Sequence, residues 1–248
     1  MSDWVQLDSA AVPGGYGDLR LLQRGNEFSI VVGKTELMTN QARGSERALG
    51  TLTCSRLADR PRARVVIGGL GMGFTLRAAL AALGPEASVV VAEIVPAVAA
   101  WARGPLSDLF AGSLDDPRTD LRVEDVGRTI QSGPGQFDAI LLDVDNGPHG
   151  LTRLANDRLY DIWGLRRARF ALRPDGILAV WSGGPDRKFK ARLKLAGFDV
   201  DEIRVHADPD GKLGRRHVLW LATRPAADAY DSPAWPAPAS REIAATGS

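Results

Sequence analysis

The chain has 248 residues, of which 44% are hydrophobic and 25% are charged, and its formal net charge is +1. This is the composition of an ordinary globular protein, and the near-neutral charge argues against a general electrostatic grip on nucleic acid. The single cysteine, Cys54, excludes an intramolecular disulfide and a cysteine-rich metal site, so we expect it to be buried on a helix. No apolar run reaches membrane-spanning length and no basic-then-apolar leader opens the chain, which favours a cytoplasmic protein without a membrane partner.

The first part of the chain predicts a small antiparallel β structure. Apolar segments alternate with two-residue turn signals that contain glycine, and the segments are residues 19–24, 28–32 and 35–38. This spacing is typical of a β-meander. We therefore expect residues 1–42 to form an N-terminal β-meander subdomain, followed by a helix over residues 46–57 that Ser45 caps.

A glycine-rich turn follows the next predicted strand. The β-branched segment Val65–Ile67 predicts a buried strand, and leucines recur at helical spacing from Leu76 onward. Glycine adopts positive φ at little cost and lets a ligand approach the backbone amides at a helix N-terminus. We therefore expect Gly69, Gly71 and Gly73 to bind a nucleotide-type ligand, with a purely structural turn as the alternative.

Acidic residues follow two further predicted strands. The strand over residues 88–92 ends at Glu93, about 20 residues after the glycine turn, where a carboxylate can accept hydrogen bonds from both ribose hydroxyls. The alternative role for Glu93 is a helix N-cap. The strand over residues 121–123 ends at Glu124 and Asp125, and Asp125 is either a ligand contact or the cap of the next helix.

The strongly apolar strand over residues 137–142 leads to Asp143 and Asp145. Ligands of parallel sheets bind beyond the carboxyl ends of the strands, so both carboxylates are candidates, with an Asx-turn as the alternative for Asp145. His149 follows in a Gly-Pro-His-Gly loop and is a candidate acid or base for the substrate, or only a loop residue. Glu46 could attract a cationic acceptor, or it is an exposed helix-start carboxylate.

The remaining pattern predicts the fold class. Strands alternate with helices, a fifth strand over residues 177–181 follows a Pro-Asp-Gly turn, and residues 198–206 and 217–223 form a closing hairpin. A mostly parallel seven-stranded sheet that ends in an antiparallel hairpin is typical of the Rossmann-like, α/β class I S-adenosylmethionine-dependent methyltransferase fold. We expect that domain over residues 43–223, and a disordered tail rich in proline and alanine over 224–248. The histidines are scattered without metal-ligand spacing, and those of the hairpin, His206 and His217, are expected to be structural.

These motifs together resemble the spermidine synthase (aminopropyltransferase) family from about Gly17 to Thr223. Residues 66–77, Val-Ile-Gly-Gly-Leu-Gly-Met-Gly-Phe-Thr-Leu-Arg, resemble its glycine loop, Ala-Glu93-Ile its ribose-binding motif, and Glu-Asp125 its adenine-binding Asp. Residues 137–143 with Gly147-Pro148 resemble its catalytic strand and loop. The resemblance implies a small-molecule acceptor that is an amine, and a homodimer. It also implies that Asp145 is the catalytic carboxylate and that Asp143 contacts the cofactor.

Three departures from the family motifs bear on the reaction. No acidic residue stands at positions 70–72, Gly44-Ser45-Glu46 replaces Tyr-His-Glu, and the catalytic loop is shortened. We therefore expect transfer of a methyl group from S-adenosylmethionine to a small nucleophile, an amine. The alternatives are aminopropyl transfer from decarboxylated S-adenosylmethionine to putrescine, which makes spermidine, a catalytically silent nucleoside-binding scaffold, and an NAD-dependent oxidoreductase.

Overall fold

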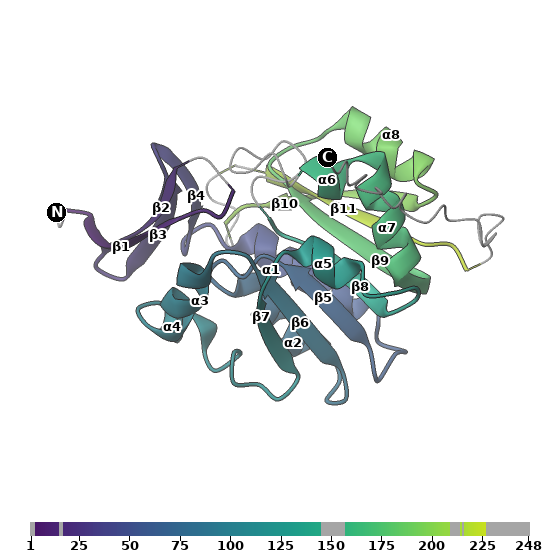
Figure 1. Cartoon of the computed structure of the whole chain (residues 1–248), viewed down its shortest axis with the longest axis horizontal. Helices are drawn as coiled ribbons and strands as arrows, with labels where there is room; N and C mark the ends of the chain where they lie inside the picture. Colours follow the sequence, from purple (N-terminus) through teal and green to yellow (C-terminus); the bar gives the residue numbers. More distant parts are fainter. Residues whose placement is uncertain (1–2, 15–16, 145–156, 209–213, 215, 227–248) are drawn as a thin grey trace, which may run out of the picture.

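A computed structural model describes residues 3–14, 17–144, 157–208, 214 and 216–226 of the chain. Two sheets organise it, and the smaller one lies to one side of the larger (Figure 1). The smaller sheet is an antiparallel meander of four strands, which are β1 (Val5–Ala11), β2 (Asp18–Arg24), β3 (Glu27–Val32) and β4 (Thr35–Thr39). The predicted meander is confirmed. Strand β1 was not predicted, because nearly all its side chains are exposed and leave no apolar alternation to detect.

The larger sheet has seven strands in the order β10-β11-β9-β8-β5-β6-β7. The strands are β5 (Arg64–Gly68), β6 (Ser88–Glu93), β7 (Thr119–Val123), β8 (Phe137–Leu142), β9 (Leu172–Ser182), β10 (Asp199–His206) and β11 (Arg216–Thr223). Strands β5 to β9 pair in parallel, whereas β11 is antiparallel to both β9 and β10. The predicted fold class is confirmed, including the closing hairpin.

Helices cover both faces of the larger sheet (Figure 1). They are α1 (Gly44–Ser55), α2 (Phe74–Ala82), α3 (Pro96–Arg103), α4 (Ser107–Phe110), α5 (Val126–Ile130), α6 (Asp157–Tyr160), α7 (Ile162–Ala171) and α8 (Arg187–Leu195). Successive residues of β5 point to opposite faces, as the pleat requires. Val65 and Ile67 pack into the core that includes α1 and α2, and Val66 packs into the core that includes α5 and α7. Side chains of the smaller sheet join the first of these cores.

One local prediction was wrong and a second was only partly right. Ser45 does not cap α1, because the helix begins at Gly44, two residues before the predicted start, with Arg43 as its N-cap; the Ser45 side chain is buried instead. The Pro-Asp-Gly segment at 174–176 falls within the bounds of β9, but Asp175 has a φ of +58° and the pairing with β8 passes from Leu172 directly to Ile177, so the predicted turn is an irregularity inside the strand. Backbone hydrogen bonds from Asp175 to Arg224 and from Arg224 to Gly176 hold it there, and Arg224 is buried although the predicted tail starts at that residue.

Other features of the described structure bear on the sequence predictions. Cys54 is buried on α1 with a free thiol, as expected. No helix within the described ranges is long and apolar enough to cross a membrane. Apart from Arg224, Pro225 and Ala226, the predicted tail lies outside the described residues.

The buried carboxylate of Asp138 is hydrogen-bonded to three arginine residues, and its substitution tests the fold. Asp138 of β8, 2% exposed, accepts hydrogen bonds from Arg60 Nη1 at 2.7 Å, from the Arg64 backbone N–H at 2.8 Å and from Arg173 Nη1 at 2.8 Å. We expect Asp138→Asn to lower the free energy of unfolding in urea by about 3 kcal/mol, because two guanidinium groups lose their counter-charge. The matched control Asp120→Asn, which breaks an exposed ion pair with Arg122, should cost less than about 1 kcal/mol. Equal losses in the two variants would contradict this account.

Candidate functional site

The glycine turn between β5 and α2 brings the two sheets into contact. Gly69, Gly71 and Gly73 have φ values of +92°, +49° and +78°, a region that favours glycine. A Cβ atom at Gly71 would lie 2.6 Å from Met38 Cε, so the flexible end of this β4 side chain would have to move if any other residue replaced Gly71. Gly73 is the N-cap of α2 and lies against the Phe110 ring. The glycine turn therefore has a packing role in addition to any role in ligand binding.

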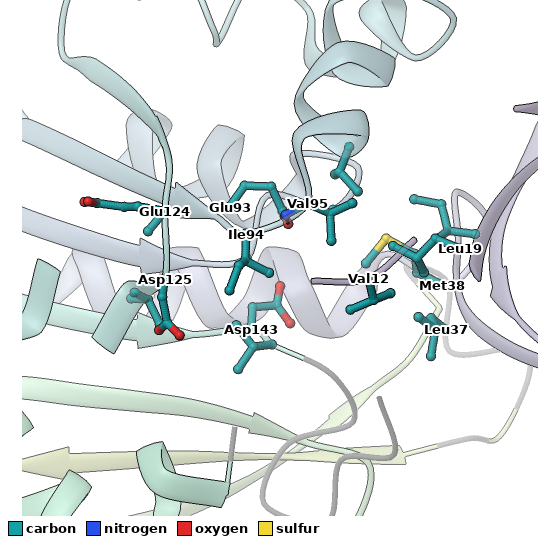
Figure 2. A pocket seen from close by; sticks show the side chains of 17 residues that line it. Val12, Leu19, Leu37, Met38, Glu93, Ile94, Val95, Glu124, Asp125 and Asp143 are labelled. Atoms are coloured by element: carbon teal, nitrogen blue, oxygen red, sulfur yellow. Dashed lines mark hydrogen bonds between the residues drawn. The ribbon is translucent and has the colours of Figure 1, made fainter. Parts of the chain in front are cut away.

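A cavity of about 130 Å³ opens beside this turn. Gly69 and Gly71 form part of its wall, and apolar side chains of the N-terminal sheet and the segment after β1 form another part, among them Val12, Leu19, Leu37 and Met38. Figure 2 shows these apolar groups facing the strand-end carboxylates across the cavity. The cavity lies beyond the carboxyl ends of β5, β6 and β8, where the strand order reverses, which is the usual ligand position in such sheets.

Glu93 ends β6 at the wall of the cavity and is held by backbone amides. Its Oε2 accepts a hydrogen bond from Leu70 N at 3.0 Å, and its Oε1 accepts one from Val95 N at 2.8 Å. Burial raises the pKa of Glu93, and these backbone N–H groups lower it in part. Val95, not Glu93, is the N-cap of α3. Each carboxylate oxygen keeps a second lone pair, so Glu93 can still accept hydrogen bonds from ligand hydroxyls.

Asp125 and its neighbour Glu124 lie at the end of β7. Asp125 caps α5 by accepting a hydrogen bond from Gly127 N at 2.8 Å, so the capping alternative is confirmed. Asp125 also lines the cavity. Glu124 accepts a hydrogen bond from Thr129 Oγ1 at 2.7 Å, and Figure 2 shows its carboxylate directed away from the centre of the cavity. Capping and ligand contact are compatible for Asp125, because a carboxylate has several acceptor positions.

Asp143 and Glu46 form a carboxylate pair beside Thr75. Thr75 Oγ1 lies 2.7 Å from Asp143 Oδ2, to which it donates a hydrogen bond, and 3.2 Å from the Glu46 carbonyl oxygen. Burial raises the pKa of Asp143 to about 6, and burial together with the nearby Asp143 charge raises the pKa of Glu46 to about 8. Near neutral pH the pair therefore holds one proton and one negative charge. The alternative of an exposed helix-start carboxylate is wrong for Glu46, which is partly buried.

A second cavity of about 410 Å³ adjoins the first. The two cavities share Leu37 and Met38 of β4, and Glu46 lines the second whereas Asp143 lines the first. The second cavity is also lined by the indole of Trp181 at the end of β9. The carboxylate pair thus stands where the two cavities meet, so a ligand in either cavity lies beside it.

Hydrogen bonds extend the carboxylate pair to Ser45 and His217, for which the sequence pattern predicts only structural roles. Ser45 Oγ donates a hydrogen bond to Glu46 Oε2 at 2.7 Å, and His217 Nδ1 lies 2.9 Å from Ser45 Oγ. The imidazole packs edge-on against the Trp181 ring, with centroids 4.6 Å apart. No local pattern could reveal this contact, because Ser45 and His217 are 172 positions apart in the chain.

Comparisons with known proteins agree with this geometry. No family model matches the chain. It is 29% identical over 210 residues to a polyamine aminopropyltransferase of Mycobacterium tuberculosis, a match that covers 80% of this chain and 38% of that protein. It is 32% identical over 163 residues to polyamine aminopropyltransferase 1 of Streptomyces coelicolor, covering 62% of this chain and 30% of that protein. The chain therefore spans less than half the length of these relatives.

The solved structure of spermidine synthase from Thermotoga maritima superimposes with a TM-score of 0.69 at 16% sequence identity, covering 90% of this chain and 73% of that one. The chain has the spermidine synthase fold. The resemblance to the spermidine synthase family that the motifs indicated is confirmed by these relatives and by this fold.

The spermidine synthase-like fold brings together most of the predicted site residues that the structure describes. Gly69, Gly71, Glu93, Asp125 and Asp143 line one cavity, and Glu46 lines the adjoining one. Gly73 lies under the Phe110 ring instead. Asp145 and His149 lie outside the described residues. Within the described ranges, no group of three His, Cys, Asp or Glu side chains is arranged to hold a metal ion.

Glu93 gives the most direct test of the nucleoside site. We expect Glu93→Ala to weaken adenosine binding by about 1 to 3 kcal/mol, because hydrogen bonds to a charged acceptor are lost, and calorimetric titration measures this change. The control is Glu86→Ala, an exposed carboxylate before the opposite end of β6, which should leave affinity unchanged. Undiminished adenosine affinity in a folded Glu93→Ala variant would refute the assignment.

Proposed function

We propose that this protein transfers an aminopropyl group from decarboxylated S-adenosylmethionine to a small amine, with putrescine as the first candidate acceptor. Its curated relatives are named polyamine aminopropyltransferases, and it shares their family's fold. These names favour the aminopropyl alternative over the methyl transfer expected from the incomplete motifs.

We also propose that the protein forms a homodimer through the exposed outer edge of β1, and the mass of the protein in solution tests this.

The observation that carries the proposal is the charge of the cavities. Among the described residues that line them there are carboxylates but no lysine or arginine, and the acidic side chains are Glu36, Glu46, Glu93, Glu124, Asp125 and Asp143. The amino-acid end of S-adenosylmethionine carries a carboxylate, which like charges in a partly buried site disfavour. The decarboxylated form has a sulfonium and an ammonium and no negative group, so it matches this lining better.

The two cavities suggest a place for each substrate. In the first cavity, Glu93 accepts hydrogen bonds from the ribose hydroxyls and Asp125 contacts the adenine. Asp143 then faces the aminopropyl ammonium. The acceptor amine occupies the second cavity beside Glu46 and Trp181, so the carboxylate pair lies between donor and acceptor. This arrangement holds the two reactants next to each other, which is the main requirement of a displacement reaction.

The chemical step is a displacement at the carbon next to the sulfonium. The acceptor nitrogen forms a bond to that carbon, the carbon–sulfur bond breaks, and sulfur leaves with the electron pair as a neutral thioether. The amine must first lose a proton, which at pH 7 costs about 4 kcal/mol for a pKa near 10. A carboxylate beside the amine can accept this proton. We assign that role to Asp145, two residues after the described Asp143.

Donor preference and its pH dependence test the proposal by calorimetry. We expect decarboxylated S-adenosylmethionine to bind at least about tenfold more tightly than S-adenosylmethionine, and NAD not to bind.

Because the pKa values of Asp143 and Glu46 are raised to about 6 and about 8, the pair gains negative charge between pH 6 and pH 8. Affinity for the dicationic donor should therefore rise over this range, by up to about tenfold per pH unit for one linked proton, and level off above it.

The Glu46→Gln variant is the control for this pH dependence. Glutamine keeps the shape of the side chain but does not ionise, so the part of the rise near pH 8 should disappear while binding itself persists. Tighter binding of S-adenosylmethionine than of its decarboxylated form would contradict the proposal and restore methyl transfer. Binding of the donor without any product from a pool of amines would favour the silent scaffold.

A further inference from the structure

We propose that His217 is a positioning residue that takes up, through Ser45, the proton that Glu46 loses when a cationic ligand enters the cavities. The ligand's class rests on the proposed function, whereas the proton path rests on the side chains themselves. The path runs from α1 to β11, and it gives Glu46 a proton acceptor in His217, which lines the second cavity together with Glu46.

The geometry forms an unbroken chain of hydrogen bonds. The Ser45 Oγ to Glu46 Oε2 distance is 2.7 Å, and the His217 Nδ1 to Ser45 Oγ distance is 2.9 Å. Ser45 is completely buried and His217 is 6% exposed, so water does not compete freely along the path. The edge-on contact with Trp181 restricts rotation of the imidazole and keeps Nδ1 directed at Ser45.

A hydroxyl carries a single proton, so this chain has two self-consistent arrangements. When Glu46 is neutral with its proton on Oε2, Glu46 donates to Ser45 and Ser45 donates to His217 Nδ1. When Glu46 is ionised, Ser45 donates to Glu46 and His217 Nδ1–H donates to Ser45. A neutral Nδ1–H imidazole would also fit the second arrangement. In the proposed form the imidazole carries a proton on Nε2 as well, so a protonated imidazole faces a carboxylate through one hydroxyl.

The change between the two arrangements moves one proton from Glu46 to His217. The Glu46 O–H bond breaks as a Ser45 O–H bond forms, and the original Ser45 O–H bond breaks as the His217 Nδ1–H bond forms. Ser45 is unchanged, Glu46 becomes negative, and His217 becomes positive. No electrons change hands and no other reactant is needed.

The surroundings explain why a cation would drive this change. Burial and the charge of Asp143 both favour the protonated form of Glu46. A sulfonium or ammonium between them reverses that preference, because opposite charge favours ionisation. The other titratable groups near the path are Glu36 across the second cavity and Asp208, which follows β10 and lies against Gly44.

Nuclear magnetic resonance of the ligand-free full chain, labelled with ¹⁵N-histidine, tests the path without any substrate. We expect the Nδ1 resonance of His217 to show an additional titration step between pH 6 and pH 9 that follows Glu46. This step should disappear in Glu46→Gln and in Ser45→Ala. His217→Gln assigns the resonance, and His206→Gln is the matched control on the same hairpin. The same His217 curve in the parent, Glu46→Gln and Ser45→Ala proteins would overturn the proposal.

Proton counting by calorimetry then tests the role of the path in binding. Decarboxylated S-adenosylmethionine is titrated in two buffers of different ionisation enthalpy, near pH 7. The parent protein should release less than one proton per ligand, because His217 retains the proton that Glu46 loses. The His217→Gln variant should release about one proton more per ligand than the parent protein. Equal release from both would count against the path. If this ligand fails to bind either protein, the proposed function is contradicted, while the resonance titration still decides the proton path.

Discussion

The convergence of buried carboxylates at one edge of the larger sheet is the constraint on which the rest of the site depends. Parallel pairing of β5, β6 and β8 sends Glu93 and Asp143 to the same end of the sheet, on either side of the glycine turn. Burial raises the pKa values of Glu93 and Asp143, so their ionised forms are disfavoured at this edge of the sheet. A positively charged ligand beside these carboxylates would favour the ionised forms.

The N-terminal sheet supplies an apolar wall of the first cavity. Met38 of β4 lies on Gly71, and its neighbours Leu37, Leu19 and Val12 form the apolar wall opposite the carboxylates (Figure 2). This wall lowers the local polarity and strengthens each electrostatic contact inside the cavity. The small sheet therefore forms part of the cavity lining, and none of its side chains labelled in Figure 2 carries a charge.

Local patterns in the sequence predicted the parts of the site that local structure determines. The glycine turn and Glu93 follow from a strand, a turn and a helix within about 30 residues, and the structure places Gly69, Gly71 and Glu93 together. Contacts between distant segments gave no such signal: Ser45 meets His217 only because α1 packs on the sheet beside β11.

The central claim is that an acidic nucleoside cavity selects a donor without a carboxylate. The most direct measurement is mass spectrometry of the products when the protein receives equimolar S-adenosylmethionine and decarboxylated S-adenosylmethionine together with putrescine. The account predicts an aminopropylated amine and methylthioadenosine, and loss of both with Asp143→Asn. A methylated amine with S-adenosylhomocysteine as the by-product would contradict it.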